Sequence, residues 1–255
     1  MHSEGWCYQL NFQIRGITMR KATAIWILMG AITFFSCQEN ETPKPSSIKL
    51  IFDFEHNRED WLGGYADLPS EGQDIYELEI SHSTLPEETN TQGKSIKIQG
   101  HNRSDDLFMF LKKHIDGLEP NTRYQIIYEV ELASQYPETS MGIGGSPGGS
   151  VFLKVGATTT EPTVDLDESN QFLYMNIDKG NQMEEGADMI NIGTIGIEGE
   201  EFKYQLIQRN NKNRPFEVTT DSEGGFWAIL GTDSGFEGLT VLYYNSIQLH
   251  LKKKN

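Results

Sequence analysis

The segment YQIIYEVEL, residues 124–132, decides the fold class of this chain. Apolar or aromatic side chains occupy every second position, and Gln125, Glu129 and Glu131 are among the residues between them. A period of two residues places the apolar side chains on one face of a β-strand and the polar ones on the other. The segment therefore predicts a half-buried strand over residues 124–134.

The same period of two residues returns near the C-terminus, in residues 241–251. Shorter segments predict further strands at 49–54, 75–80, 95–98, 107–111, 151–155, 172–177, 202–207 and 226–230. Clusters of Gly, Pro, Asn and Asp separate these segments, and no long stretch keeps the 3.6-residue period of an amphipathic helix. Many short strands joined by turns predict an all-β chain folded as an antiparallel β-sandwich or jelly roll.

The N-terminal residues have the layout of an export signal. Arg20 and Lys21 precede an uncharged run, residues 22–35, which is shorter than the ~20 apolar residues of a membrane span. We therefore expect residues 1–36 to be an export signal, of which residues 1–18 are an over-extended start.

The last residues of this signal, Phe34-Phe35-Ser36-Cys37, resemble the lipobox of bacterial lipoproteins, in particular those of the Bacteroidetes type. The resemblance implies that Cys37 carries a lipid anchor of acyl chains and that the protein is held in the cell envelope, on the outer membrane. Residues 37–47, with two prolines, are expected to be an extended tether. The β-sandwich domain is then expected to span residues 48–255.

The chain is acidic, with a formal net charge of −16 at pH 7. A surface of this sign repels phosphate backbones, so nucleic acid is excluded as a partner. The acidity is compatible with calcium or neutral ligands, and equally with a simple contribution to solubility. Because the only other cysteine, Cys7, lies in the expected signal, we predict no disulfide in the mature chain.

Four short motifs follow one another in the order seen in galactose-binding-like jelly rolls, a group that includes many carbohydrate-binding modules. They are Phe52-Asp53-Phe54-Glu55 with Trp61 shortly after, then residues 93–98, residues 118–124 and residues 242–247. The resemblance implies that the first and last strands pair and that the turn at 120–124 begins a long central strand. Residues 141–199 match nothing in this group and are expected to be an insertion or elaborated loops.

The resemblance also implies a structural Ca²⁺ between the first and the closing strand. Glu55, with Asp53, matches the acidic position of the first strand, and Asn245 takes the closing position, where Asp is more usual. An Asn keeps an oxygen ligand but removes a charge, and ligand charge tunes calcium affinity. Asp53, Glu55 and Asn245 are therefore candidate Ca²⁺ ligands; the alternative is that they are solvated residues at strand ends.

Carbohydrate binding needs aromatic faces that stack on sugar rings and polar side chains that bond to hydroxyl groups. The candidate aromatic residues in predicted loops are Trp61, Tyr65, Tyr136 and Phe236, and the candidate polar residues are Asn102, Arg103, Asp105, Asp106, Asp233 and Glu237. Since aromatic residues are more often buried than ligand-binding, we expect Tyr65 and Tyr136 to be the exposed ones.

No catalytic residue is predicted. Residues 144–148 fit the pattern G-x-S-x-G of a nucleophile elbow, but Pro147 lacks the N–H group that an oxyanion hole needs there. We therefore expect an envelope lipoprotein whose β-sandwich binds carbohydrate or another small surface ligand. Two alternatives stay open, a glycan-active enzyme with an unrecognised carboxylate pair and a structural or assembly subunit that binds a partner protein.

Overall fold

The alternating segment forms strand β7 (Arg123–Ser134) in the interior of an antiparallel sheet, where it has neighbours on both sides. Its side chains at even positions from Tyr124 to Leu132 are buried, and those at the odd positions between them are half-buried. The computed structural model describes residues 47–254, and these contain strands and short 3₁₀ turns but no α-helix. The predicted all-β class is therefore confirmed.

The first sheet has seven strands in the order β12-β7-β15-β5-β4, with β1 also paired to β15 and β13 to β7. Its other strands are β1 (Ser47–Phe52), β4 (Glu79–Thr84), β5 (Lys94–His101), β12 (Gln205–Asn210), β13 (Phe216–Thr219) and β15 (Leu239–Lys253). Strand β1 pairs antiparallel with β15 from Ser47 opposite Lys252 to Phe52 opposite Ile247. The first and last strands are therefore neighbours, as the resemblance implied.

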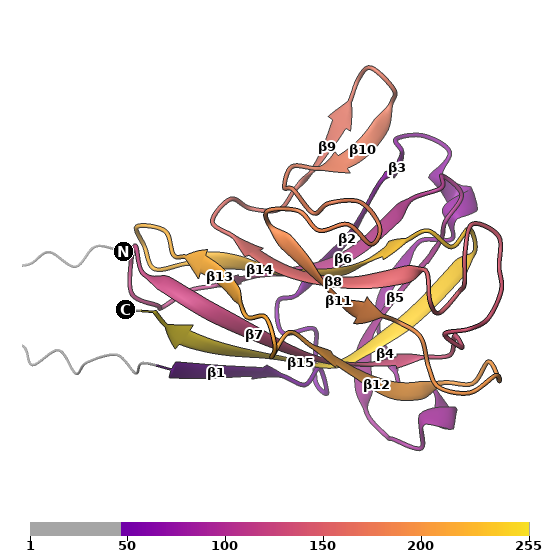
Figure 1. Ribbon diagram of the computed structural model, residues 1–255, viewed down its shortest axis with the longest axis horizontal. Helices are drawn as coiled ribbons and strands as arrows, with labels where there is room; N and C mark the ends of the chain where they lie inside the picture. The colour runs from indigo at the N-terminus through magenta and orange to yellow at the C-terminus, as the bar shows by residue number, and fades with distance from the viewer. Residues whose placement is uncertain (1–46, 255) are drawn as a thin grey trace, which may run out of the picture. The chain divides into compact units, whose positions relative to one another are not determined.

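The second sheet has five strands in the order β11-β8-β14-β6-β2. They are β2 (Leu62–Ala66), β6 (Leu107–Ile115), β8 (Val151–Thr158), β11 (Met189–Thr194) and β14 (Phe226–Ser234). Strands β5, β6, β7 and β8 alternate between the two sheets, and so do β13, β14 and β15. Such crossing connections between antiparallel sheets are those of a jelly roll, and Figure 1 shows the resulting sandwich.

The hydrophobic core lies between the two sheets. It includes Phe54, Tyr124 and Tyr128 from the side of the first sheet and Leu153 and Leu230 from the second, all at most 1% exposed. The hydroxyl of Tyr128 donates a hydrogen bond to the backbone oxygen of Gly156 on β8. The core therefore joins the two sheets by apolar packing and by this hydrogen bond.

Residues 141–199 are only partly an elaboration of the sandwich. Their strands β8 and β11 belong to the second sheet, whereas β9 (Val164–Asp167) and β10 (Phe172–Met175) form a hairpin. Strand β10 also pairs with β3 (Leu68–Pro69) in a separate three-stranded sheet, which Figure 1 shows beside the sandwich.

The strand predicted at 75–80 is wrong in its first half. A 3₁₀ turn, Gln73–Tyr76, occupies it, and β4 begins only at Glu79. Glu77 adopts a left-handed backbone conformation (φ 51°), which interrupts an extended strand. A second 3₁₀ turn, Glu87–Thr89, lies between β4 and β5.

The expected export signal, Cys37 and most of the tether lie outside the described residues. Within residues 47–254, no helix is long and apolar enough to cross a membrane.

Candidate functional site

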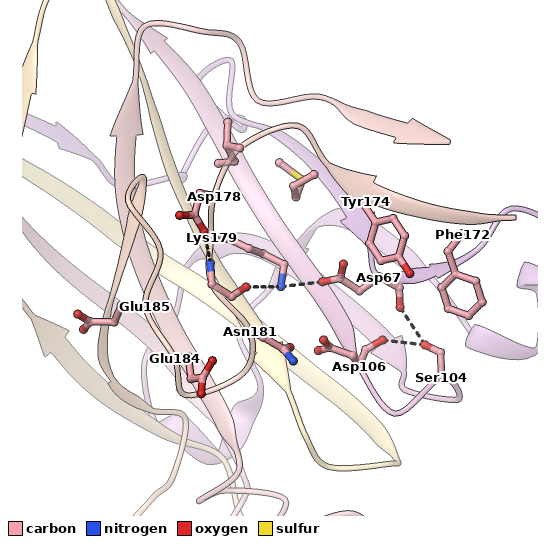
Figure 2. A pocket seen from close by; sticks show the side chains of 13 residues that line it. Asp67, Ser104, Asp106, Phe172, Tyr174, Asp178, Lys179, Asn181, Glu184 and Glu185 are labelled. Carbon is pink, nitrogen blue, oxygen red and sulfur yellow. Dashed lines mark hydrogen bonds and ion pairs between the residues drawn. The ribbon is translucent and has the colours of Figure 1, made fainter. Parts of the chain in front are cut away.

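A pocket of about 680 Å³ lies beside strand β10, where the β9–β10 hairpin, the segment 178–185 and the loop before β6 meet (Figure 2). Aromatic, carboxylate, hydroxyl and amide side chains line it. The lining residues are Asp67, Ser104, Asp106, Phe172, Tyr174, Met175, Ile177, Asp178, Lys179, Gly180, Asn181, Glu184 and Glu185.

Two aromatic side chains lie along one side of the pocket in Figure 2. Phe172 and Tyr174 are two residues apart on β10, and side chains at that spacing point to the same side of a strand. Their rings are nearly parallel, with an interplanar angle of 23° and centroids 6.1 Å apart. Tyr174 is 38% exposed, and its hydroxyl accepts a hydrogen bond of 3.0 Å from the Asn170 amide. The pocket thus has an exposed aromatic surface.

Five ionisable residues at the base of the pocket are here named the charged cluster: Asp67, Asp106 and Lys179, which line the pocket, and Lys154 and Asp233, which lie beneath it. Lys154 is fully buried, and its ammonium donates to Asp233 Oδ2 at 2.9 Å and to the backbone oxygens of Lys179 at 2.9 Å and Glu184 at 2.8 Å. The Lys179 ammonium lies 2.7 Å from Asp67 Oδ2 and 2.8 Å from Asp233 Oδ2. The cluster therefore ties the segment 178–185 to β8 and β14.

The protonation of the charged cluster balances its charges. Burial and, after it, the hydrogen bond to the neighbouring Asp233 together raise the pKa of Asp106 to about 8. Although burial opposes it, the ammonium of Lys179 holds the pKa of Asp233 below its usual range. Burial also raises the pKa of Asp67 and lowers that of Lys154, and the ion pairs at 2.7–2.9 Å oppose both shifts. With a proton on Asp106, the carboxylates of Asp67 and Asp233 match the two ammonium groups.

The carboxylates of Asp67, Asp106 and Asp233 offer oxygen atoms within 4.8 Å of one another, a spacing that could hold a metal ion. Two of these carboxylates already contact ammonium groups at 2.7–2.9 Å. A metal bound there would share the carboxylates of Asp67 and Asp233 with the ammonium groups of Lys154 and Lys179.

The predicted calcium ligands lie elsewhere, at the end of strand β1 and on β15. Asp53 Oδ1 accepts a hydrogen bond of 3.1 Å from the backbone of Glu55, and Glu55 Oε2 accepts one of 3.1 Å from the backbone of Lys94. The amide of Asn245 donates to Glu131 at 2.6 Å. Each of the three side chains therefore has a different hydrogen-bond partner within the protein. The calcium site stays a prediction.

Two of the predicted sugar-stacking residues are buried. Trp61 is 1% exposed and packs edge-on against Phe52, with ring centroids 5.5 Å apart. The expectation that Tyr136 is exposed is wrong, since it is 5% exposed. Its hydroxyl donates to the Leu239 oxygen at 3.1 Å and accepts from the Val241 backbone at 2.8 Å. Packing against the core leaves neither ring a face for a ligand.

Asn102 is buried as well, and its side chain forms hydrogen bonds within the protein. Its amide donates to the backbone oxygens of Ser234 at 2.9 Å and Phe236 at 3.2 Å. Tyr65 is half-buried, and its hydroxyl donates to the Gln99 oxygen at 2.9 Å. The remaining predicted residues outside the pocket are Arg103, Asp105, Phe236 and Glu237, of which Phe236 is half-buried and the others are exposed.

Of the predicted ligand residues, Asp106 lines the pocket and Asp233 lies beneath it. Sequence reasoning missed the aromatic pair on β10, because residues 172–177 were predicted only as a short strand and not as a ligand site. It also missed Lys154, which stands in an apolar strand with Leu153 and Val155 on either side. A lysine inside an otherwise apolar run was the available signal, because buried lysines need partners.

No family model matches the chain, and no curated protein was found to be similar to it in sequence. Among solved structures, it is similar to the mannan-recognising carbohydrate-binding module TmCBM27, with 11% identity, a TM-score of 0.35 and coverage of 82% of this chain and 99% of that one. It is also similar to the family 11 carbohydrate-binding module of a Clostridium thermocellum cellulosomal cellulase, with 8% identity, a TM-score of 0.36 and coverage of 81% and 95%.

A third similar structure is the enzymatically active domain of tailspike protein 4 from bacteriophage CBA120. The identity is 12% and the TM-score 0.34, and the match covers 77% of this chain but only 20% of the tailspike chain. Similarities at this level do not place the chain in a family, so its function has to be argued from the pocket.

Proposed function

We propose that this protein is a carbohydrate-binding β-sandwich and that the pocket beside β10 is its ligand site. The observation that carries the proposal is the exposed aromatic surface of Phe172 and Tyr174 next to polar side chains in one cavity. Sugar rings present C–H groups that pack on aromatic faces, while their hydroxyl groups need hydrogen-bond partners. The pocket supplies both kinds of contact.

The polar partners are of the types that sugar hydroxyl groups require. The carboxylates of Asp178 and Glu184 accept hydrogen bonds, and the amide of Asn181 both donates and accepts. The volume of about 680 Å³ falls within the range of roughly 300–1,000 Å³ that is usual for small-molecule sites.

The charged cluster supports the proposal because it fixes one wall of the pocket. The Lys154 ammonium binds the backbone oxygens of Lys179 and Glu184, and these two residues bracket Asn181. A wall that is already ordered loses less conformational entropy when a ligand binds.

Calorimetric titration of the full chain with a panel of oligosaccharides tests the proposal. Replacing Tyr174→Ala removes an exposed ring, and a lost aromatic contact of about 0.5–1.5 kcal/mol lowers affinity by roughly 2- to 10-fold. The matched control is Phe202→Ala, another exposed aromatic residue, which does not line the pocket and should leave affinity unchanged. Equal affinities of the wild type and the Tyr174→Ala variant would contradict this site.

We also propose that the protein is a lipoprotein of the cell envelope, anchored through Cys37. The support is the sequence alone, namely the basic pair Arg20-Lys21, the uncharged run 22–35 and the lipobox-like residues 34–37. Mass spectrometry of the N-terminal fragment from cells should find acyl chains on Cys37. A Cys37→Ala variant that is still acylated and membrane-bound would count against the anchor.

A further inference from the structure

The wall of the pocket opposite the aromatic pair carries more negative than positive charge. Asp178, Glu184 and Glu185 all come from the segment 178–185, and Figure 2 shows them on the side away from Phe172 and Tyr174. Arg214 neutralises Glu185, with its Nη1 2.8 Å from Oε2 and its Nη2 on Oε1. Within residues 47–254, neither Asp178 nor Glu184 has an ion-pair partner within 4.0 Å.

Both unpaired carboxylates are held in place by the backbone around them. Asp178 Oδ1 accepts from the Gly180 N–H at 3.2 Å, and Oδ2 accepts from the Ala187 N–H at 2.9 Å. These hydrogen bonds hold the pKa of Asp178 below its usual range. Glu184 is anchored through its own backbone oxygen, 2.8 Å from the Lys154 ammonium, while its side chain is exposed.

The charged cluster at the base of the pocket does not offset these two charges. Its two ammonium groups contact the carboxylates of Asp67 and Asp233 at 2.7–2.9 Å, and Asp106 adds no positive charge whether or not it carries a proton. The pocket therefore has a net negative charge beside an aromatic surface. Carboxylates attract a cation directly, and the face of an aromatic ring such as Tyr174 attracts it through its quadrupole.

We infer that the ligand of this pocket is a cationic sugar, one that carries a free, protonated amino group. The inference rests on the proposed carbohydrate-binding function and narrows its ligand class. The amino group pairs with Glu184 and Asp178, while the sugar ring packs on Tyr174. The same charges repel uronic acids and sulfated sugars, and acetylation of the amine removes the attraction.

The test compares oligosaccharides of equal length that differ in charge. The full chain is titrated at pH 6 and low salt with a β-1,4-linked glucosamine oligomer, its fully N-acetylated counterpart and an oligogalacturonate. Since an exposed ion pair contributes ~0.2–1 kcal/mol, two such pairs predict a roughly 2- to 30-fold preference for the free amine over the acetylated form. The preference should shrink in 0.5 M salt, because salt screens exposed charges.

Two substitutions locate the effect. Glu184→Gln keeps the size of the side chain and removes its charge, so it should weaken binding of the amine by about 2- to 5-fold and leave the acetylated oligomer unchanged. Glu200→Gln removes an exposed carboxylate that does not line the pocket and is the matched control. An equal loss in both variants would mean attraction by the acidic surface as a whole and would overturn the inference.

The outcomes separate this inference from the function on which it rests. If the neutral oligomer binds in a Tyr174-dependent manner and the amine brings no gain, the cationic class is wrong and the sugar site stands. If the oligogalacturonate binds most tightly, the cationic class is likewise wrong. If no oligosaccharide shows binding that depends on Tyr174, the proposed function itself fails.

Discussion

Leu153 and Lys154 are adjacent on strand β8 and both fully buried, but on opposite sides of the same sheet. Leu153 faces the sandwich and belongs to its apolar core. Lys154 faces the segment 178–185 and bonds to three oxygen atoms. An apolar residue is stabilised by any well-packed apolar surroundings, whereas a buried ammonium depends on particular partners at particular distances.

Leu153 and Lys154 belong to two different layers of the molecule, the core between the sheets and an outer layer of charged residues. The core between the sheets joins the strands of the jelly roll, and its residues repeat every second position. The outer layer joins Asp67, Asp106, Lys179 and Asp233 from separate segments and creates the pocket wall. Substitutions that change the volume of a side chain therefore alter the sandwich core, and substitutions that change its charge alter the pocket wall.

The largest effect is expected from Lys154→Met, which keeps a long side chain and removes the ammonium. Asp233 loses one of its two cations and two backbone oxygens lose their donor, so the free energy of unfolding should fall by about 3–5 kcal/mol. Urea unfolding measures the change. The double variant Lys154→Met/Asp233→Asn should recover part of the loss, because the unpaired carboxylate is gone.

The control on the other side of the sheet is Leu153→Ala. A buried leucine truncated to alanine costs about 2–5 kcal/mol, and no second substitution of a charged residue should recover it. Sugar affinity should persist in folded Leu153→Ala and be lost in folded Lys154→Met. If both variants bound sugar equally well, the outer layer would not be what positions the pocket wall.

A smaller effect is expected from Asp106→Asn, which mimics the protonated acid. The pKa of Asp106 is raised to about 8 in the folded protein, so the folded state binds the proton more tightly than the unfolded state does. The stability of the wild type should consequently fall as the pH rises from 6 to 8, and level off above.

The variant has no proton to lose at this position, so its stability should be flatter over the same pH range. Between pH 6 and 8 we expect the wild type to lose about 1 kcal/mol more stability than the variant, a value below the full linkage value because Asp106 is partly exposed. Chemical unfolding at pH 6, 7, 8 and 9 measures it. Parallel pH profiles for the two proteins would show that Asp106 is already ionised at neutral pH.

The smallest effect is expected from chelation of calcium. We propose that Asp53, Glu55 and Asn245 hold a structural Ca²⁺. Asp53 and Glu55 follow within three residues of Phe52, and Phe52 pairs with Ile247, two residues after Asn245. At a calcium concentration ten times Kd, a chelator should remove about 1.4 kcal/mol of stability, a fall in Tm of roughly 3–6 °C. An Asn245→Ala variant should no longer respond. An unchanged Tm of the wild type would remove the calcium proposal.

Much of the frame was predictable from local pattern. The alternation at 124–134 and 241–251 predicted β7 and β15, and the predicted apolar positions of β7 are buried. In β15, Ile247, Leu249 and Leu251 are buried as predicted, but Val241 and Tyr243 are half-buried, because an irregularity between Tyr244 and Ser246 reverses the faces of the strand.

The separation of 75–80 into a turn and a strand was not predictable, because the left-handed conformation of Glu77 leaves no mark in the hydrophobic pattern. Trp61 and Tyr136 were predicted as sugar-stacking residues because they were expected in loops. Both are buried, since both segments fold back onto the core.

The sequence by itself determined the all-β class and the alternating faces of the main strands, while the pairing of the first and last strands was implied only by the resemblance to galactose-binding-like jelly rolls. Tertiary structure alone decided the site, because Asp67, Asp106, Lys154, Lys179 and Asp233 lie in five segments that share no local pattern. The period of a strand is set by the geometry of neighbouring residues in the chain. A buried charged group instead needs partners in space, and these exist only after the segment 178–185 has packed on the second sheet.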